Sequence, residues 1–138
     1  MPIKQTLEGK IRYRIKRGRD SVYIPPDFFD LSDRDQVGRV LRQLIKEGLL
    51  VKIGQGIYAR AKQSSLTGKP VPEKDLRSLA LEALKKLGIK TAPSSYEKAY
   101  NAGRSTQVPT GRVVGVKDRV SRRIGFNGRY IKYEHVTG

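Results

Sequence analysis

A capped amphipathic segment, residues 32–48, constrains the fold of this 138-residue chain more than any other feature. Ser32 is followed three residues later by Asp35, a capping-box pattern that begins a helix. Gly48 is typical of the position after a helix end. Apolar residues recur between them at helical spacing, at Val37, Val40, Leu41, Leu44 and Ile45. The pattern therefore predicts a helix with one buried face and one polar face.

Two short β-like runs follow this helix. Residues 49–53 and 57–60 flank the sequence Gly54-Gln55-Gly56, and glycine accepts the positive φ that a tight hairpin turn requires. The same glycines match a loose G-x-G-x-x-A dinucleotide-binding pattern, but that pattern needs a helix directly after it. Because Ile57 and Tyr58 favour a strand, the sequence predicts a two-stranded hairpin instead.

Two helices and a short strand are expected before residue 32. A first helix is predicted by apolar residues that recur every four positions, at Ile3, Leu7, Ile11 and Ile15. Residues 10–16 also alternate between charged and apolar or aromatic side chains, so a strand is the alternative there. A short β-like run over 21–24 precedes a short helix over 25–31, which begins at two prolines. This order predicts a winged helix-turn-helix domain over residues 1–60, whose capped helix enters the DNA major groove.

The polar face of the capped helix carries arginine and glutamine ends, which can reach base edges in the major groove. The residues expected to read bases are Arg34, Gln36, Arg39, Arg42, Gln43 and Lys46. Those expected on phosphates, along the wing or after the first helix, are Lys16, Arg17, Arg19, Lys52, Gln55, Tyr58 and Arg60. The alternative is a solvated face on which Asp35 and Arg39 form an ion pair four residues apart.

The second half of the chain is expected to be a separate domain, residues 73–138, after a linker over 61–72 that is rich in Ser, Gly and Pro. A helix begins near residue 73 and ends before Gly88, and a second capping box runs from Ser94 to Glu97. Residues 111–116, 120–126 and 129–134 are β-like. The fold class expected for the whole chain is α+β, a winged helix-turn-helix followed by a small domain of helix and β-hairpin.

Asn127-Gly128 is the strongest hairpin signal in the chain. A two-residue turn there pairs position 126 with 129 and sets Arg123 opposite Lys132, a like-charge pair that a bound anion would relieve. We therefore expect a basic surface in this domain, formed by Arg119, Arg122, Arg123, Arg129 and Lys132. Two solvated side chains that avoid each other are the alternative explanation.

Net charge points to the class of partner. The chain holds 29 Lys and Arg against 13 Asp and Glu, a formal net charge of +16. Such an excess favours a polyanion, because cations that neutralise phosphates release condensed counterions. We therefore expect double-stranded DNA as the partner and no membrane partner.

Zero cysteines and one histidine exclude disulfides, thiolate nucleophiles and Cys/His zinc sites. His135 lies at the end of the last expected strand, where a surface residue is the simpler interpretation. We expect no catalytic residues, no metal and no cofactor, and hence a protein that is not an enzyme. The N-terminus lacks a secretory signal and no apolar run is long enough to cross a bilayer, so a cytoplasmic location is expected.

Four segments carry a family resemblance: residues 21–28 (SVYIPPDF), the pattern V-x-x-V-L-x-x-L-x-x-E-G over 37–48, Gly56-Ile57-Tyr58, and residues 103–109 (GRSTQVP). With them the chain resembles, over nearly its whole length, antitoxins of the abortive-infection type IV (AbiE-like) toxin-antitoxin systems. The resemblance implies a winged helix that represses its own operon at an operator of inverted repeats, and a C-terminal domain linked to antitoxic action. It also implies a cognate nucleotidyltransferase-like toxin, countered directly or only functionally. Fuller members continue beyond the last expected strand, whereas this sequence stops at Gly138.

An RNA- or ribosome-associated basic protein that uses the C-terminal sheet is the alternative function. Single-stranded RNA binders usually present several aromatic side chains on one sheet face. Tyr130 and Tyr133 are expected on opposite faces of one strand, which does not provide such a platform. The sequence therefore favours DNA.

Overall fold

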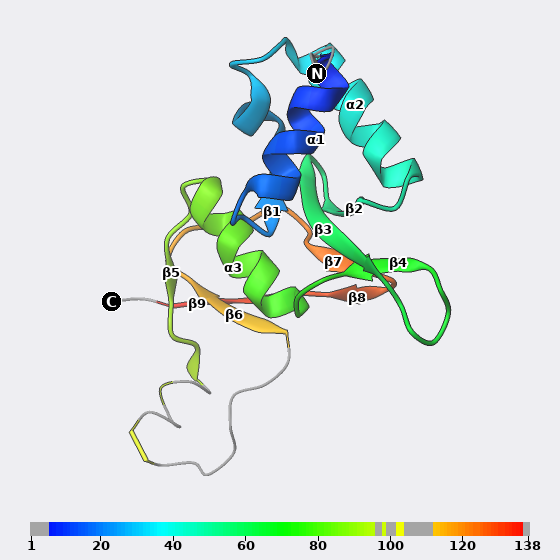
Figure 1. The fold of residues 1–138 in the computed structure, drawn as a ribbon. Helices are drawn as coiled ribbons and strands as arrows, with labels where there is room; N and C mark the ends of the chain where they lie inside the picture. The colour runs from blue at the N-terminus through cyan, green and yellow to red at the C-terminus, as the bar shows by residue number, and fades with distance from the viewer. Residues whose placement is uncertain (1–5, 96–97, 99–101, 104–111, 137–138) are drawn as a thin grey trace. The chain divides into compact units, whose positions relative to one another are not determined.

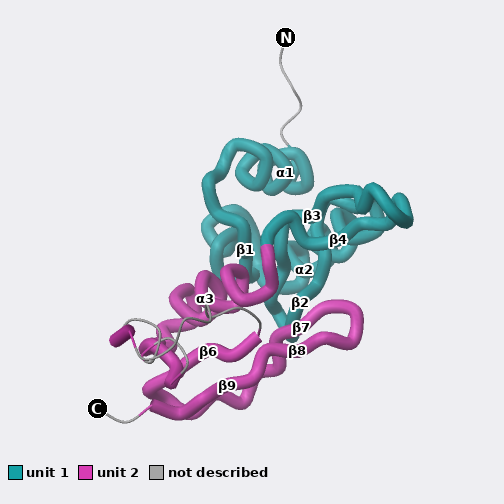
Figure 2. The backbone as a smooth tube through the Cα atoms, turned by 90° about the horizontal axis from the view of Figure 1, so that it is seen from below, with its two compact units in different colours: residues 1–74 teal, residues 75–138 magenta. Residues whose placement is uncertain are grey.

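The computed structural model describes residues 6–95, 98, 102–103 and 112–136. The chain divides into two compact units, unit 1 (residues 1–74) and unit 2 (residues 75–138), coloured separately in Figure 2. Helices and strands are mixed in both units, so the fold is α+β (Figure 1). Among the described residues, no helix combines the length and apolarity that crossing a bilayer would need.

Unit 1 begins with helix α1 (Leu7–Arg17). The Thr6 hydroxyl accepts a hydrogen bond from the Gly9 backbone N–H at 3.0 Å and so caps the first turn. Ile11 and Ile15 are fully buried, as the four-residue spacing predicts, and the strand alternative for residues 10–16 is wrong. Ile3 lies outside the described residues.

The short helix expected over 25–31 is a single 3₁₀ turn, η1 (Pro25–Phe28), which follows strand β1 (Val22–Tyr23). The Asp27 carboxylate accepts a hydrogen bond from the Ile24 backbone N–H at 3.0 Å, and Phe28 is fully buried. This single turn is enough to place Phe28 in the core.

Helix α2 (Arg34–Lys46) precedes strands β2 (Leu50–Gly54), β3 (Ile57–Gln63) and β4 (Pro70–Pro72). The sheet has the order β1-β3-β2 with antiparallel pairing, and β4 pairs with the last part of β3. The core of unit 1 lies between these helices and the sheet and contains Ile11, Ile15, Tyr23, Phe28, Val37, Leu41, Leu44, Leu50 and Tyr58.

The linker expected at residues 61–72 is instead a second β-hairpin. Ala61 pairs with Pro72 and Gln63 with Pro70, and the Ser64 N–H donates to the Lys69 carbonyl at 2.8 Å across the loop. Composition suggested a linker because Ser, Gly and Pro are loop formers, but prolines are tolerated in an edge strand that offers its carbonyls. Unit 1 therefore extends to residue 74 rather than 60.

Unit 2 begins with helix α3 (Leu76–Lys86), capped by Asp75, whose carboxylate accepts the Ser78 backbone N–H at 2.9 Å. Strands β5 (Thr91–Ala92), β6 (Val113–Val116) and β9 (Lys132–His135) form one sheet in the order β5-β6-β9, and β7 (Gly125–Phe126) pairs with β8 (Arg129–Tyr130). The buried apolar residues of unit 2 are Leu79, Ala80, Ala83, Leu84, Val114, Val116, Ile124, Ile131 and Val136.

The β-strands of unit 2 match the sequence prediction only in part. Phe126 pairs with Arg129 as expected, but the expected strand over 120–126 is reduced to its last two residues and the run 129–134 is divided between β8 and β9. Residues 96–97 and 104–109, which hold part of the second capping box and of the GRSTQVP segment, lie outside the described residues.

Candidate nucleic-acid interface

Helix α2 is held by a cap at its start and by a buried apolar face. Asp33, rather than Ser32, is the N-cap residue, because its carboxylate accepts the Gln36 N–H at 2.9 Å while the Ser32 N–H bonds the preceding turn at Phe28. The capping-box assignment is therefore wrong by one residue. Val37, Leu41 and Leu44 are fully buried. This arrangement leaves the opposite side of α2 in solvent.

Two arginines of α1 bind residues that flank α2 in the sequence. Arg12 donates to both oxygens of Glu47, the C-cap residue of α2, at 2.8 and 2.9 Å. Arg14 donates to both carboxylate oxygens of Asp30 at 2.8 and 2.9 Å and to the Asp27 carbonyl at 2.7 Å, just before α2 begins. The hydrogen bonds from Arg12 and Arg14 lower the pKa values of Glu47 and Asp30 and raise those of the two guanidinium groups.

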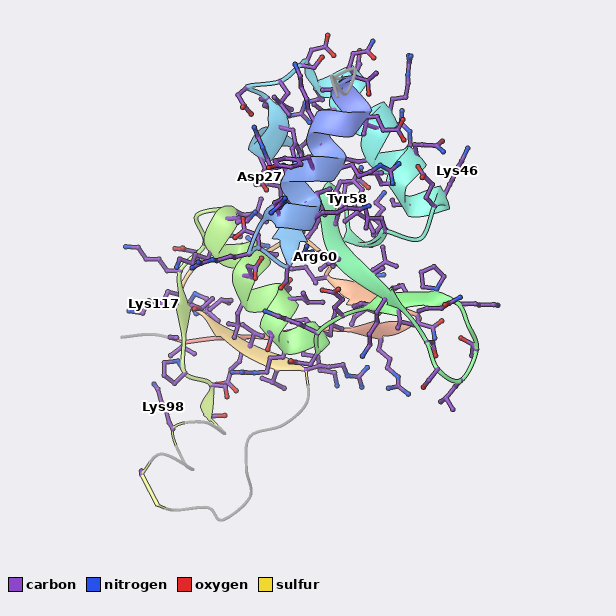
Figure 3. All side chains as sticks on the ribbon, viewed as in Figure 1. Asp27, Lys46, Tyr58, Arg60, Lys98 and Lys117 are labelled. Carbon is purple, nitrogen blue, oxygen red and sulfur yellow. The ribbon has the colours of Figure 1, made fainter. Side chains whose placement is uncertain are left out.

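The polar face of α2 is exposed along its whole length. Residues 39, 42, 43 and 46 follow the spacing i, i+3, i+4 and i+7 and so form one stripe, and the side chain of Lys46 extends away from the helix end (Figure 3). All six residues expected to read bases are exposed: Arg34, Gln36, Arg39, Arg42, Gln43 and Lys46. Arg34 lies in the first turn, nearer the buried side, and we refer to the other five residues as the α2 polar face.

The cations of the α2 polar face have no internal partner among the described residues. The side chains of Arg39, Arg42 and Lys46 make no hydrogen bond or ion pair with any residue that the structure describes. The alternative Asp35–Arg39 ion pair is not formed there. Arg34 lies over the Phe29 ring, with its guanidinium carbon 5.6 Å from the ring centroid. Gln43 makes one long contact, 3.5 Å, with the Glu47 carboxylate. The unpaired cations leave their donors free for an external anion or base edge.

The β2–β3 turn provides a second exposed polar element. Gly56 takes a φ of 68°, which a side chain would strain, and this lets residues 54–57 reverse the chain within a hairpin. Lys52 and Gln55 are both exposed and contact each other at 3.5 Å. Lys16, Arg17 and Arg19 are also exposed around the end of α1, where Arg17 stacks on Tyr13 at 5.5 Å from the ring centroid.

Tyr58 and Arg60, which were expected on phosphates, have internal partners in the structure. Tyr58 is only 8% exposed and belongs to the core. Arg60 donates to the carbonyls of Ile15, Lys16 and Gly18 at 2.5 to 3.1 Å and so caps the end of α1. Both Tyr58 and Arg60 are labelled in Figure 3. Tyr58 therefore packs in the core and Arg60 binds the end of α1, which differs from the phosphate contacts expected from the sequence.

The five cations expected to form a basic surface in unit 2, Arg119, Arg122, Arg123, Arg129 and Lys132, are all exposed. The expected pairing of Arg123 with Lys132 is not formed, because β7 begins only at Gly125 and Lys132 pairs with Val113 in the sheet with β6. Arg123 instead lies over the ring of Tyr130, 5.2 Å from its centroid. The Tyr133 hydroxyl donates to the Arg122 carbonyl at 2.9 Å, and burial raises the pKa of Tyr133.

A family profile described as a family of unknown function (DUF6088) matches residues 8–138. The chain belongs to this family. No curated protein and no solved structure matches the chain significantly. In the described part of this DUF6088 protein, no three His, Asp or Glu side chains are grouped as a metal site would require.

In this DUF6088 protein, an arginine stacks on every exposed aromatic ring among the described residues. Arg17 lies over the Tyr13 ring, Arg34 over Phe29, and Arg123 over Tyr130. Only the spacing of Tyr13 and Arg17, four residues apart in a helix, could have been recognised from the sequence. The other two pairs depend on a turn and on hairpin pairing.

Proposed function

We propose that unit 1 acts as a winged helix-turn-helix that binds double-stranded DNA, with α2 in the major groove and the β2–β3 turn as a wing against the backbone. The element order α1, β1, η1, α2, β2 and β3, with sheet order β1-β3-β2, supports this role. An α-helix with an exposed polar face is the element that a major groove accommodates.

The contrast between two groups of cations in unit 1 carries the proposal. Arg12, Arg14 and Arg60 donate to internal acceptors and hold α1 against α2 and the sheet. Arg39, Arg42 and Lys46 share one face of α2 and have no partner among the described residues. Exposed, unpaired cations repel one another, whereas a phosphate backbone offsets that repulsion and releases counterions.

The stacked aromatic rings favour duplex DNA over single-stranded RNA. A single-strand binder uses exposed aromatic faces to stack bases. Tyr13, Phe29 and Tyr130 each have a guanidinium over the ring, which competes with a base for that position. We therefore do not pursue the RNA alternative as a second function.

In the cell, we propose that this binding represses the protein's own operon, and that the chain is the antitoxin of a nucleotidyltransferase-like toxin. This step rests on the similarity of residues 21–28, 37–48 and 56–58 to AbiE-like antitoxins. In this role the chain acts by binding and carries out no reaction. A neighbouring reading frame for a nucleotidyltransferase-like protein, and loss of its toxicity on co-expression, would support the antitoxin role.

Fluorescence anisotropy with two labelled duplexes tests DNA binding: the protein's own promoter and a scrambled duplex of equal length. The double variant Arg39→Gln, Arg42→Gln should lower the ratio of promoter to scrambled affinity. A matched control, Lys62→Gln with Lys69→Gln, removes the same charge from exposed positions in the β3–β4 hairpin, at the other end of β3 from the turn. It should leave the ratio unchanged. Equal effects of the two double variants on the ratio would exclude α2 as the reading element.

A further inference from the structure

The β7–β8 hairpin holds one arginine of unit 2 in a fixed position. Its turn residues, Asn127 and Gly128, both take positive φ, 56° and 81°, as a tight two-residue hairpin requires. Gly125 pairs with Tyr130 across the hairpin. A Cβ at Gly125 would collide with the Tyr130 ring and with the Arg129 carbonyl, so the ring lies directly against the backbone of β7. The Tyr130 ring is thereby oriented by the absence of a side chain opposite it.

The Tyr130 ring also contacts Arg123. The guanidinium carbon lies 5.2 Å from the ring centroid, and Tyr130 remains 46% exposed. The preceding residue is fixed separately, since the Tyr133 hydroxyl donates to the Arg122 carbonyl at 2.9 Å. Two tyrosines thus restrain the irregular segment that presents Arg123, one through its ring and one through its hydroxyl.

Within the described residues, no carboxylate forms an ion pair with the Arg123 side chain. Its contact there is the Tyr130 ring. The two described acids of residues 112–136 accept backbone N–H groups instead. Asp118 accepts from Lys90 at 3.2 Å, and Glu134 accepts from the Ser95 N–H and hydroxyl at 2.6 and 2.8 Å. Further exposed cations that lack a described partner are Arg119, Arg129 and Lys132.

We propose that Arg123, held on Tyr130, is a phosphate-binding residue for the backbone of duplex DNA, in addition to the contacts of unit 1. The proposal rests on the DNA-binding function proposed above, which identifies the anion. A guanidinium presents a planar fork of donors that matches two phosphate oxygens. Stacking leaves the edge of that fork free while it restricts the side chain, and so lowers the entropy lost on binding.

The test uses the full chain and a promoter duplex of about 30 base pairs, with affinity measured by anisotropy at about 50 and 200 mM salt. Arg123→Gln should remove one phosphate contact, so its loss of affinity between the two salt concentrations should be about 3.5-fold smaller than that of the wild type. Lys85→Gln removes the same charge from an exposed position on α3 and is the matched control. It should behave as the wild type.

Two substitutions of Tyr130 test whether the ring positions the arginine. Tyr130→Leu removes no charge but should weaken binding about two- to fivefold, the range expected for an exposed cation–π contact. Tyr130→Phe keeps the ring and should bind as the wild type does. Circular dichroism and thermal unfolding check that each variant folds. Should Tyr130→Leu unfold, Arg123→Lys replaces it, because lysine keeps the charge and loses the stacked planar fork; it should weaken binding as well.

The outcomes separate this proposal from the proposed function. If Arg123→Gln and Lys85→Gln have equal effects, Arg123 contributes only to the general positive field and the proposal is wrong. It is equally wrong if binding is unchanged by Arg123→Gln yet weakened by substitution of Arg39 and Arg42, and DNA binding by unit 1 then stands. A wild-type chain without measurable affinity for any duplex would instead overturn the proposed function itself.

Discussion

At the scale of single residues, arginines perform two distinct tasks in unit 1. A guanidinium that meets a carboxylate or several carbonyls, as in Arg14 and Arg60, joins elements that are distant in the sequence. Arg39 and Arg42 have the same chemistry but lie on a solvent face without acceptors in the described structure. The surroundings of a guanidinium, rather than its residue type, therefore separate a structural arginine from a candidate ligand-binding one.

Single substitutions at Arg39, Arg42 and Gln43 are expected to show which base pair each side chain reads. Replacing Arg39 or Arg42 by alanine should cost about 1–3 kcal/mol of binding free energy and relax discrimination at one base-pair position, because a bidentate contact to a base edge is lost. Gln43 should show a smaller effect, since it shares its amide with Glu47. Competition with single-base promoter variants measures these preferences. An unchanged preference in both arginine variants would contradict the assignment.

Arg60 and Lys52 are expected to respond in opposite ways to neutralisation. Arg60→Gln should lower the free energy of unfolding by about 1–3 kcal/mol, because three carbonyls at the end of α1 lose a charged donor. Lys52→Gln should leave stability within about 0.5 kcal/mol, as exposed substitutions usually do. It should instead reduce the salt slope of DNA binding by about one unit. Urea unfolding and salt titration of both variants provide the comparison.

At the scale of elements, the described α-helices α1, α2 and α3 each start at a side chain that accepts a backbone N–H. Thr6, Asp33 and Asp75 cap α1, α2 and α3 in turn. For Asp75 the Ser78 backbone N–H is the main cause of a lowered pKa, followed by the Ser78 hydroxyl. The negative charge of this cap also interacts favourably with the positive end of the helix dipole.

Acid is therefore expected to destabilise α3 through Asp75. Its pKa in the folded chain lies below the ordinary value of 3.8, so the ionised cap stabilises the fold above that value and the contribution is lost as pH falls through the lowered pKa. Asp75→Asn retains a good N-cap residue that does not titrate. Between about pH 5 and pH 2.5, the wild type should lose more unfolding free energy than this variant. Identical pH profiles would show that the cap does not contribute.

At the scale of the whole molecule, the boundary between the units follows β4 rather than preceding it. The strand pairs Pro70 and Pro72 with Gln63 and Ala61, and the Glu73 N–H donates to the Arg60 carbonyl at 2.9 Å. A cut within the β3–β4 loop would therefore remove one side of a hydrogen-bonded hairpin. A cut after Lys74 leaves unit 1 with its sheet and core complete.

Two truncated chains test this boundary. Residues 1–74 should unfold cooperatively and keep the promoter preference, because α2 and the β2–β3 turn are retained. Residues 1–68 should unfold at a lower temperature, because β3 loses its partner β4. The fragment 1–74 should also bind DNA more weakly than the full chain, with a shallower salt slope, if unit 2 contributes phosphate contacts. Equal stability of the two fragments would place the boundary before β4.

Local patterns in the sequence were sufficient to predict helices α1, α2 and α3 and the β2–β3 hairpin. The apolar spacing of Val37, Leu41 and Leu44 and the glycine at 56 depend on neighbours within a few residues, so periodicity and turn chemistry were sufficient. Tertiary structure alone decided the strand β4, the burial of Tyr58, the capping role of Arg60 and the stacking of Arg123 on Tyr130. The burial of Tyr58 and the role of Arg60 depend on strand pairing and helix packing between segments that are far apart in the sequence. Strand β4 and the stack of Arg123 on Tyr130 depend on where each hairpin begins and ends, which residue composition does not specify.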